Sequence, residues 1–144
     1  MKDFTLAAAA IDVAALRSAL GSERAGAVAC FEGVVRDHSE GRAVRRLAYQ
    51  AYAPLAEAEG ARIVAAARAR HAIERIVCVH RVGDLDVGEI AVWVGVSAAH
   101  RDAAFSACRW IIDEVKARVP IWKHERYVEG DTQWLHPEQS AIEE

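Results

Sequence analysis

Two stretches, Ser97-Ala98-Ala99-His100-Arg101 and Pro120-Ile121-Trp122-Lys123-His124-Glu125, enclose the helical pattern on which the architecture of this chain depends. Between them, apolar residues recur at the spacing of a helix that buries one face: Ala104, Cys108, Ile111 and Val115. We expect a helix over residues 101–118 with Ser97 as its cap, ended by Pro120 and followed by a strand.

Both ends of this predicted helix carry cations. His100 and Arg101 fall in the first turn, where the helix dipole disfavours each positive charge by about 0.3–1 kcal/mol. They suit a docked anion, which the free N–H groups of a helix N-terminus already favour, or else contacts with acidic side chains such as Glu89 or with a partner subunit. His100 and Lys116 are about 24 Å apart along one helix. If both serve one small ligand, that site is built from two copies of the chain.

Three further cations are candidates for the same chemistry. Arg36 directly follows an apolar strand, which would give its guanidinium a rigid base, although a solvated arginine is the simpler interpretation. Lys116 and Lys123 can meet if the chain turns back after Pro120, and two neighbouring ammonium groups lower each other's pKa. Such a pair would hold a phosphate or carboxylate and offer one amine for proton transfer; two solvated lysines are the alternative.

Composition excludes several classes of protein. The chain has 144 residues, of which 53% are hydrophobic, enough for the core of one domain. Its 18 Lys and Arg against 21 Asp and Glu give a net charge of −3, so we expect no nucleic-acid partner. No apolar stretch approaches the roughly 20 residues of a membrane span, so we expect no membrane partner. Three cysteines in apolar runs predict core thiols in a reducing, cytoplasmic protein, and the histidines lack metal-ligand spacing.

The remaining pattern alternates strands with helices. Strands are expected over residues 4–8, 26–35, 44–52, 76–82, 89–97 and 121–128, and helices over 12–20 and 54–70 besides 101–118. Gly33 is expected to mark a bulge, and Asp12 to cap its helix. Two expected hairpins, around loop 36–41 and around Gly83–Gly88, favour an α+β fold with a mixed, mostly antiparallel sheet and about three helices. We expect one domain over residues 1–135 and an acidic tail over 136–144.

Several ordered motifs carry a family resemblance. They are Phe31-Glu32-Gly33-Val34-Val35-Arg36, His80-Arg81-Val82-Gly83, Gly95-Val96-Ser97-Ala98-Ala99-His100-Arg101, and Lys116 followed by Pro120 to Glu125. Together they resemble the MoaE family, the catalytic large subunit of molybdopterin synthase, from about Gly26 to Trp134. Ordered motifs at matching spacing are more specific than any one of them.

The resemblance implies an α/β-hammerhead-like homodimer that acts as a sulfurtransferase. Members take sulfur from the C-terminal Gly-Gly thiocarboxylate of a small ubiquitin-like carrier of the MoaD type. They add it to cyclic pyranopterin monophosphate (precursor Z), which forms the dithiolene of molybdopterin. A central dimer with one carrier at each end makes a heterotetramer, and no cofactor is implied.

The resemblance also implies roles for residues. Lys116 and Lys123 would be catalytic and would also bind substrate, with Lys123 as the cationic partner. Arg36 and the backbone of Val34 and Val35 would line the substrate pocket, and His124 and Glu125 would lie at its edge. His100 and Arg101 would reach in from the dimer mate to hold the phosphate.

Two other functions stay open from the residues alone. One is a binding module that captures the tail of a ubiquitin-like protein without turnover. The other is an unrelated homodimeric enzyme acting on another small phosphate ester. The first would bind a carrier and make no product; the second would be active without a carrier.

Overall fold

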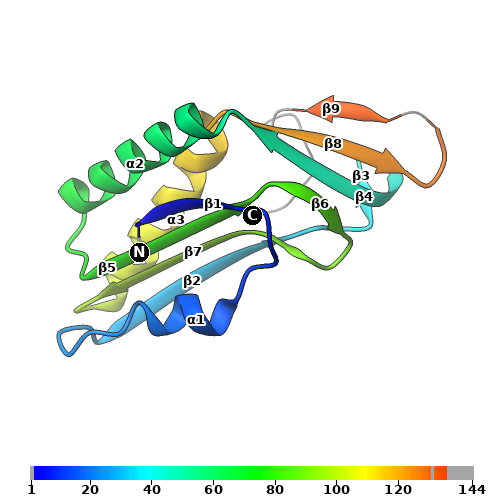
Figure 1. Cartoon of the computed structure of the whole chain (residues 1–144). Coiled ribbons are helices and arrows are strands. Elements are labelled where there is room, and N and C mark those ends of the chain that lie inside the picture. Colours follow the sequence, from blue (N-terminus) through cyan, green and yellow to red (C-terminus); the bar gives the residue numbers. More distant parts are fainter. Residues whose placement is uncertain (1, 131, 136–144) are drawn as a thin grey trace.

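The chain folds into two sheets, and it crosses from one sheet to the other several times (Figure 1). The structure is a computed structural model that describes residues 2–130 and 132–135, so the predicted tail 136–144 lies outside the described residues. The strands are β1 (Phe4–Ala7), β2 (Ala27–Val34), β3 (His38–Ser39), β4 (Arg42–Ala51), β5 (Arg75–Arg81), β6 (Gly83–Asp86), β7 (Ile90–Ala98), β8 (Ile121–Tyr127) and β9 (Gln133–Leu135). The helices are α1 (Val13–Ser18), α2 (Ala53–Arg70) and α3 (Arg101–Arg118).

The first sheet has the order β1-β5-β7-β2 and is covered on both faces. Helices α2 and α3 pack on one face, where alternate residues of β5 such as Ile76 and Cys78 join the main core. On the other face, Val77 and Val79 join Trp93 and Leu20 in a smaller core beside α1. This double covering explains why β5 and β7 read as nearly continuous apolar runs.

The second sheet contains β8 and β9, the last two described strands, and extends away from the helices (Figure 1). Its order is β3-β4-β8-β9, and β6 pairs with the other edge of β4. Strand β4 is antiparallel to β8, with Tyr49 opposite Lys123 and Leu47 opposite Glu125. The register therefore fixes which side chains of β4 lie beside the charged residues of β8.

The predicted α+β class, three helices and mostly antiparallel pairing are confirmed. Helix α3 begins and ends where its apolar spacing predicts, and Asp12 caps α1 through a 3.2 Å bond from the Ala15 N–H to its Oδ1. The predicted bulge is also present, because the β2–β7 register shifts between Gly33 and Val34. Close packing requires glycine at position 33: a Cβ would lie 2.6 Å from Cγ1 of Val92.

The predicted hairpin between strands 26–35 and 44–52 is wrong. Strand β2 pairs with β7, whereas β4 pairs with β8 and β6, so loop 36–41 passes from one sheet to the other. Within that loop the short β3 pairs back on β4 through a tight turn at Glu40 and Gly41, both at positive φ. The segment that follows Arg36 is therefore a small hairpin of its own.

Three smaller predictions are also wrong. Ser97 is a buried residue inside β7 rather than a cap; His100 occupies the cap position of α3 without a side-chain bond. The predicted turn at Gly83-Asp84 is strand β6, because the chain crosses to β4 before returning to β7. Cys30 is exposed, since β2 is an edge strand, whereas Cys78 and Cys108 are buried as expected. Within the described residues, none of the helices combines the length and apolarity that a membrane span needs.

Candidate functional site

The candidate site is centred on a buried ion pair of β8. Strand alternation turns Lys123, Glu125 and Tyr127 to the same side as Ile121, toward the interior. Lys123 is 0% exposed and Glu125 2% exposed, and Nζ of Lys123 lies 3.3 Å from Oε2 of Glu125. Apart from this ion pair, the buried ammonium has no hydrogen-bond partner among the described residues.

The carboxylate of Glu125 is held by two hydroxyl groups as well as by Lys123. Its Oε1 accepts hydrogen bonds from the Tyr127 hydroxyl at 2.9 Å and from Oγ of Ser39 at 3.1 Å. Each oxygen of the carboxylate therefore faces a donor or a cation. Ser39 belongs to β3, so this bond joins the hairpin after Arg36 to β8.

The electrostatics of Lys123 suit a reactive amine. Burial, with smaller contributions from the charges of Lys116 and Arg36, lowers the pKa of Lys123 to about 8, while Glu125 opposes the shift. The predicted mutual influence of the two lysines is therefore present, although burial is the larger cause. Near neutral pH Lys123 remains mostly protonated, yet it can release a proton at modest cost.

Two elements bring Arg36 and Lys116 to this ion pair. Lys116 lies half-buried in the last turn of α3, and the chain then turns at Val119 and Pro120 into β8. Arg36 follows β2, which packs along α3. Val35 is buried, and its N–H donates to the Glu89 carbonyl at 2.9 Å while its carbonyl accepts from the Gly88 N–H at 2.9 Å. Both backbone polar groups of Val35 are thus hydrogen-bonded within the fold, whereas Val34 is more exposed beside the bulge.

A neutral histidine forms another part of the surroundings. The ring of His80 packs edge-on against Tyr49 with centroids 4.9 Å apart, and Tyr49 lies opposite Lys123 on β4. Nδ1 of His80 donates to the Arg81 carbonyl at 2.7 Å, so Nε2 is the unprotonated nitrogen. Burial lowers the pKa of His80 to about 4, and the charge of Lys116 adds to the shift. His80 thus adds no positive charge near Lys116.

The remaining predicted residues lie elsewhere. His100 and Arg101 are exposed at the start of α3, at the opposite end of the helix from Lys116. His124 points to the other face of β8 from Glu125, where its ring stacks on Trp134 with centroids 4.6 Å apart. His124 and Glu125, both predicted to lie at the edge of the pocket, thus point to opposite faces of β8.

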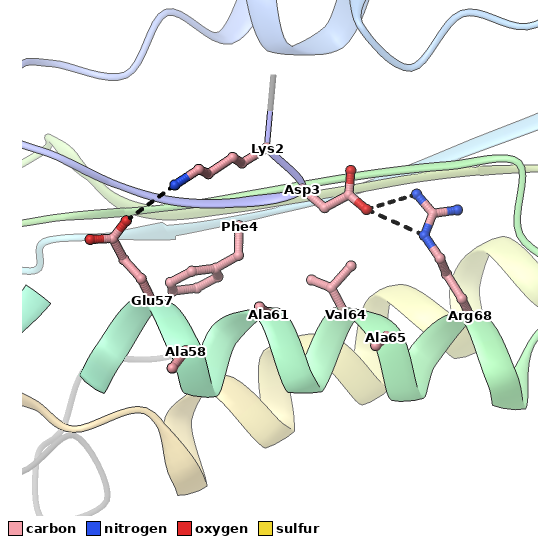
Figure 2. Close-up of a pocket in the computed structure, with 9 residues that line it drawn as sticks. All are labelled: Lys2, Asp3, Phe4, Glu57, Ala58, Ala61, Val64, Ala65 and Arg68. Atoms are coloured by element: carbon pink, nitrogen blue, oxygen red, sulfur yellow. Dashed lines mark hydrogen bonds and ion pairs between the residues drawn. The ribbon is translucent and has the colours of Figure 1, made fainter. Parts of the chain in front are cut away.

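Four hollows that described residues line contain, of the predicted site residues, only His124. A hollow of about 530 Å³ lies between β1 and α2, where ion pairs Lys2–Glu57 and Asp3–Arg68 flank small apolar side chains (Figure 2). Its charges are paired with each other, so it offers no surplus cation to an anionic ligand. In the part of the chain that the structure describes, no three His, Cys, Asp or Glu side chains gather into a possible metal site.

Comparison with known proteins decides the family. The family model described as "MoaE protein" matches residues 6–118, which include Arg36, His100, Arg101 and Lys116.

The chain belongs to the MoaE family. A catalytic subunit of molybdopterin synthase from Oryza sativa subsp. indica is 50% identical over 107 residues, and the match covers 74% of this MoaE chain. That match spans only 55% of the rice protein, so the MoaE chain corresponds to about half of the longer plant relative. The Pyrococcus abyssi protein of the same name is 46% identical over 112 residues, which are 78% of this chain and 76% of that protein.

A solved structure shows the same fold. The crystal structure of molybdopterin synthase from Staphylococcus aureus superposes with a TM-score of 0.87 at 35% identity. The superposition covers 93% of this MoaE chain and 97% of that one.

Sequence reasoning missed Ser39, Tyr49, His80 and Tyr127 as neighbours of the candidate site in this MoaE chain. Period-two alternation from Ile121 would have placed Lys123, Glu125 and Tyr127 on one buried face. His80 stands in an otherwise apolar run, which signals a polar group with a buried partner. Ser39 carries no such signal, because its bond to Glu125 spans 86 positions of sequence.

Proposed function

We propose that this MoaE chain is the catalytic subunit of a molybdopterin synthase. It is a sulfurtransferase that moves sulfur from the C-terminal thiocarboxylate of a small ubiquitin-like carrier to cyclic pyranopterin monophosphate. The product carries the dithiolene of molybdopterin, and the carrier leaves as a carboxylate. Family membership and the names of the relatives support this assignment.

The buried ammonium of Lys123 is the observation that carries the proposal. A buried cation with unused donors is costly unless a ligand completes its contacts. Arg36 and Lys116 add positive charge at the same place, and both lie close enough to lower the pKa of Lys123. The substrate phosphate, the thiocarboxylate and the released carboxylate are all anions, so this cluster stabilises charge throughout the reaction.

The two lysines take different roles. Lys123, held by Glu125 inside the fold, is the cationic partner that stabilises anionic groups. Lys116 is half-buried at the end of α3 and acts as the catalytic acid or base beside the carrier terminus. Arg36 binds the anionic substrate, with Val34 and Val35 lining that part of the pocket.

His100 and Arg101 complete the pocket from a second copy of the chain. Helix α3 is one uninterrupted helix of 18 residues, so His100 and Lys116 of a single copy are about 24 Å apart. A homodimer would bring the N-terminal end of one α3 to the C-terminal end of the other and so hold the phosphate. One carrier on each subunit makes a heterotetramer.

The other features of the proposal follow from the same chemistry. Residues 1–135 form the catalytic domain. Sulfur moves from a thiocarboxylate to carbon without a resident cofactor or metal, and the protein works in the cytoplasm.

A mixing assay tests the function. Purified protein, cyclic pyranopterin monophosphate and a thiocarboxylated carrier are combined, and the product is detected as its fluorescent oxidised pterin. We expect product from the native chain and at least a hundred-fold less from Lys116→Ala. Carrier binding without product would favour the binding module instead, and full activity of Lys116→Ala would contradict the role of Lys116.

A further inference from the structure

Ser39 lies in the hairpin that follows Arg36, and its hydroxyl donates to Glu125 of the buried ion pair. It is 4% exposed, although it lies in a short surface hairpin, because its hydroxyl turns inward to Glu125. Tyr127 donates to the same oxygen, but from within β8 itself. Of these two hydroxyl donors to Oε1, Ser39 is the one that comes from outside β8.

Besides the pairing of β3 with β4, the segment around Arg36 is held at three points. Val35 bonds to Gly88 and Glu89 beside the first sheet, and the Asp37 carbonyl accepts from the Val44 N–H at 2.7 Å. The third point is the bond from Ser39 to Glu125, which directly joins this segment to the partner of Lys123. Removing it leaves the segment held by Val35, by Asp37 and by the pairing of β3 with β4, but takes away the Ser39 side-chain bond to the partner of Lys123.

We propose that Ser39 is a positioning residue that holds the Arg36 segment against the Lys123–Glu125 pair. Its hydroxyl fixes the spacing between the guanidinium of Arg36 and the ammonium of Lys123, so that both cations meet one anionic substrate. The expected change in KM rests on the proposed function, whereas the hydrogen bond from Ser39 to Glu125 is a property of the fold.

The decisive comparison is between Ser39→Ala and Tyr127→Phe. Each variant removes one hydroxyl donor from the same carboxylate oxygen, but only the first removes a bond between the hairpin and β8. We expect Ser39→Ala to raise the KM for cyclic pyranopterin monophosphate about five- to ten-fold with kcat within about two-fold, because a charge-assisted hydrogen bond is lost. Tyr127→Phe is expected to raise this KM less than Ser39→Ala does, and Ser39→Thr, which keeps the hydroxyl, to restore the native KM.

A double-mutant cycle identifies the route of the effect. In an Arg36→Ala background, Ser39→Ala is expected to raise KM by less than about two-fold, because Ser39 acts through Arg36. An undiminished effect in that background would overturn the inference. So would equal effects of Ser39→Ala and Tyr127→Phe, since the carboxylate alone would then explain both.

Amide hydrogen exchange tests whether Ser39 holds the segment, and it does not depend on an activity assay. Ser39→Ala is expected to speed exchange across residues 36–43 at least five-fold, and Tyr127→Phe to leave that segment unchanged. An unchanged segment in Ser39→Ala would contradict this role of Ser39. If the native chain makes no product, the proposed function fails, and the exchange result still decides whether Ser39 holds the segment.

Discussion

At the scale of single residues, the most informative feature is that β8 buries a lysine and a glutamate side by side. Removing both charges from water is expensive, and their mutual attraction offsets the cost only with further hydrogen bonds. Ser39 and Tyr127 supply those bonds to Glu125, whereas Lys123 keeps donors without partners among the described residues. Glu125 is thus satisfied by the described residues, and the unused donors of Lys123 support the proposal that it binds an anionic ligand.

The pH dependence of activity follows from Lys123. Because its protonated form binds the anions, kcat/KM is expected to be flat at neutral pH and to fall as pH rises through about 8. Glu125→Gln removes the attraction that raises the pKa of Lys123, so the fall should move to lower pH by about one unit or more.

Glu23→Gln is the control for that pH–rate measurement, because it removes an exposed glutamate that precedes β2. Its profile should match the native one. A profile of the native chain that rises through pH 8 would mean that the neutral amine of Lys123 is the active form.

His80 makes stability fall in acid. Its pKa is about 4 in the folded chain and about 6.5 when unfolded, so the unfolded state binds the proton first. The contribution is complete above the unfolded pKa and is lost as pH falls from about 6.5 toward 4. Between about pH 7 and pH 5 the native chain should lose about 2 kcal/mol of unfolding free energy more than His80→Gln.

Urea unfolding at a fixed protein concentration measures this difference. His38→Gln removes an exposed histidine of β3 and should keep the acid sensitivity of the native chain. An equal acid loss in His80→Gln and the native chain would refute the assignment of a buried neutral His80.

At the scale of elements, α2 is fitted to β1 through a single glycine. Gly60 in the middle of the helix lies under the ring of Phe4, and a Cβ there would come within 2.2 Å of Cδ1. Replacing glycine by alanine inside a helix normally stabilises by about 1 kcal/mol. Here the steric overlap reverses the sign, and Gly60→Ala should destabilise the chain by about 1–3 kcal/mol.

Chemical denaturation of Gly60→Ala tests this fit between α2 and β1. In a Phe4→Leu background the flexible side chain can move aside, and the penalty of the alanine should shrink or change sign. A more stable Gly60→Ala in the native background would show that the helix does not depend on this close approach.

In this chain, local sequence patterns predict the helices and strands better than they predict which strands pair. Helix α3 follows from its apolar spacing and Pro120, and the bulge at Gly33 from the glycine itself. The pairing of β2 with β7 instead of β4 depends on contacts between distant segments, which alternation alone does not encode. For the same reason, the cations of the site are visible in the sequence, but the bond from Ser39 to Glu125 is not.

At the scale of the whole molecule, α3 organises the proposed site. It carries Lys116 at one end and His100 with Arg101 at the other, too far apart for one small ligand within one copy. The first-sheet edge strand β2 runs along this helix, with exposed Cys30 and Phe105 beside each other on one surface. Because of the separation along α3, each complete pocket of the proposed enzyme needs two copies of the chain.

The most direct measurement mixes two inactive variants, Lys116→Ala and His100→Ala/Arg101→Ala, and follows molybdopterin formation with a thiocarboxylated carrier. A hybrid dimer contains one pocket with native Lys116 from one copy and native His100 and Arg101 from the other. After subunit exchange at equal amounts, we predict recovery of roughly a quarter of the native activity, since half of the dimers are hybrids with one good pocket each. No recovery, despite hybrid dimers detected by native mass spectrometry, would contradict a pocket shared between two copies.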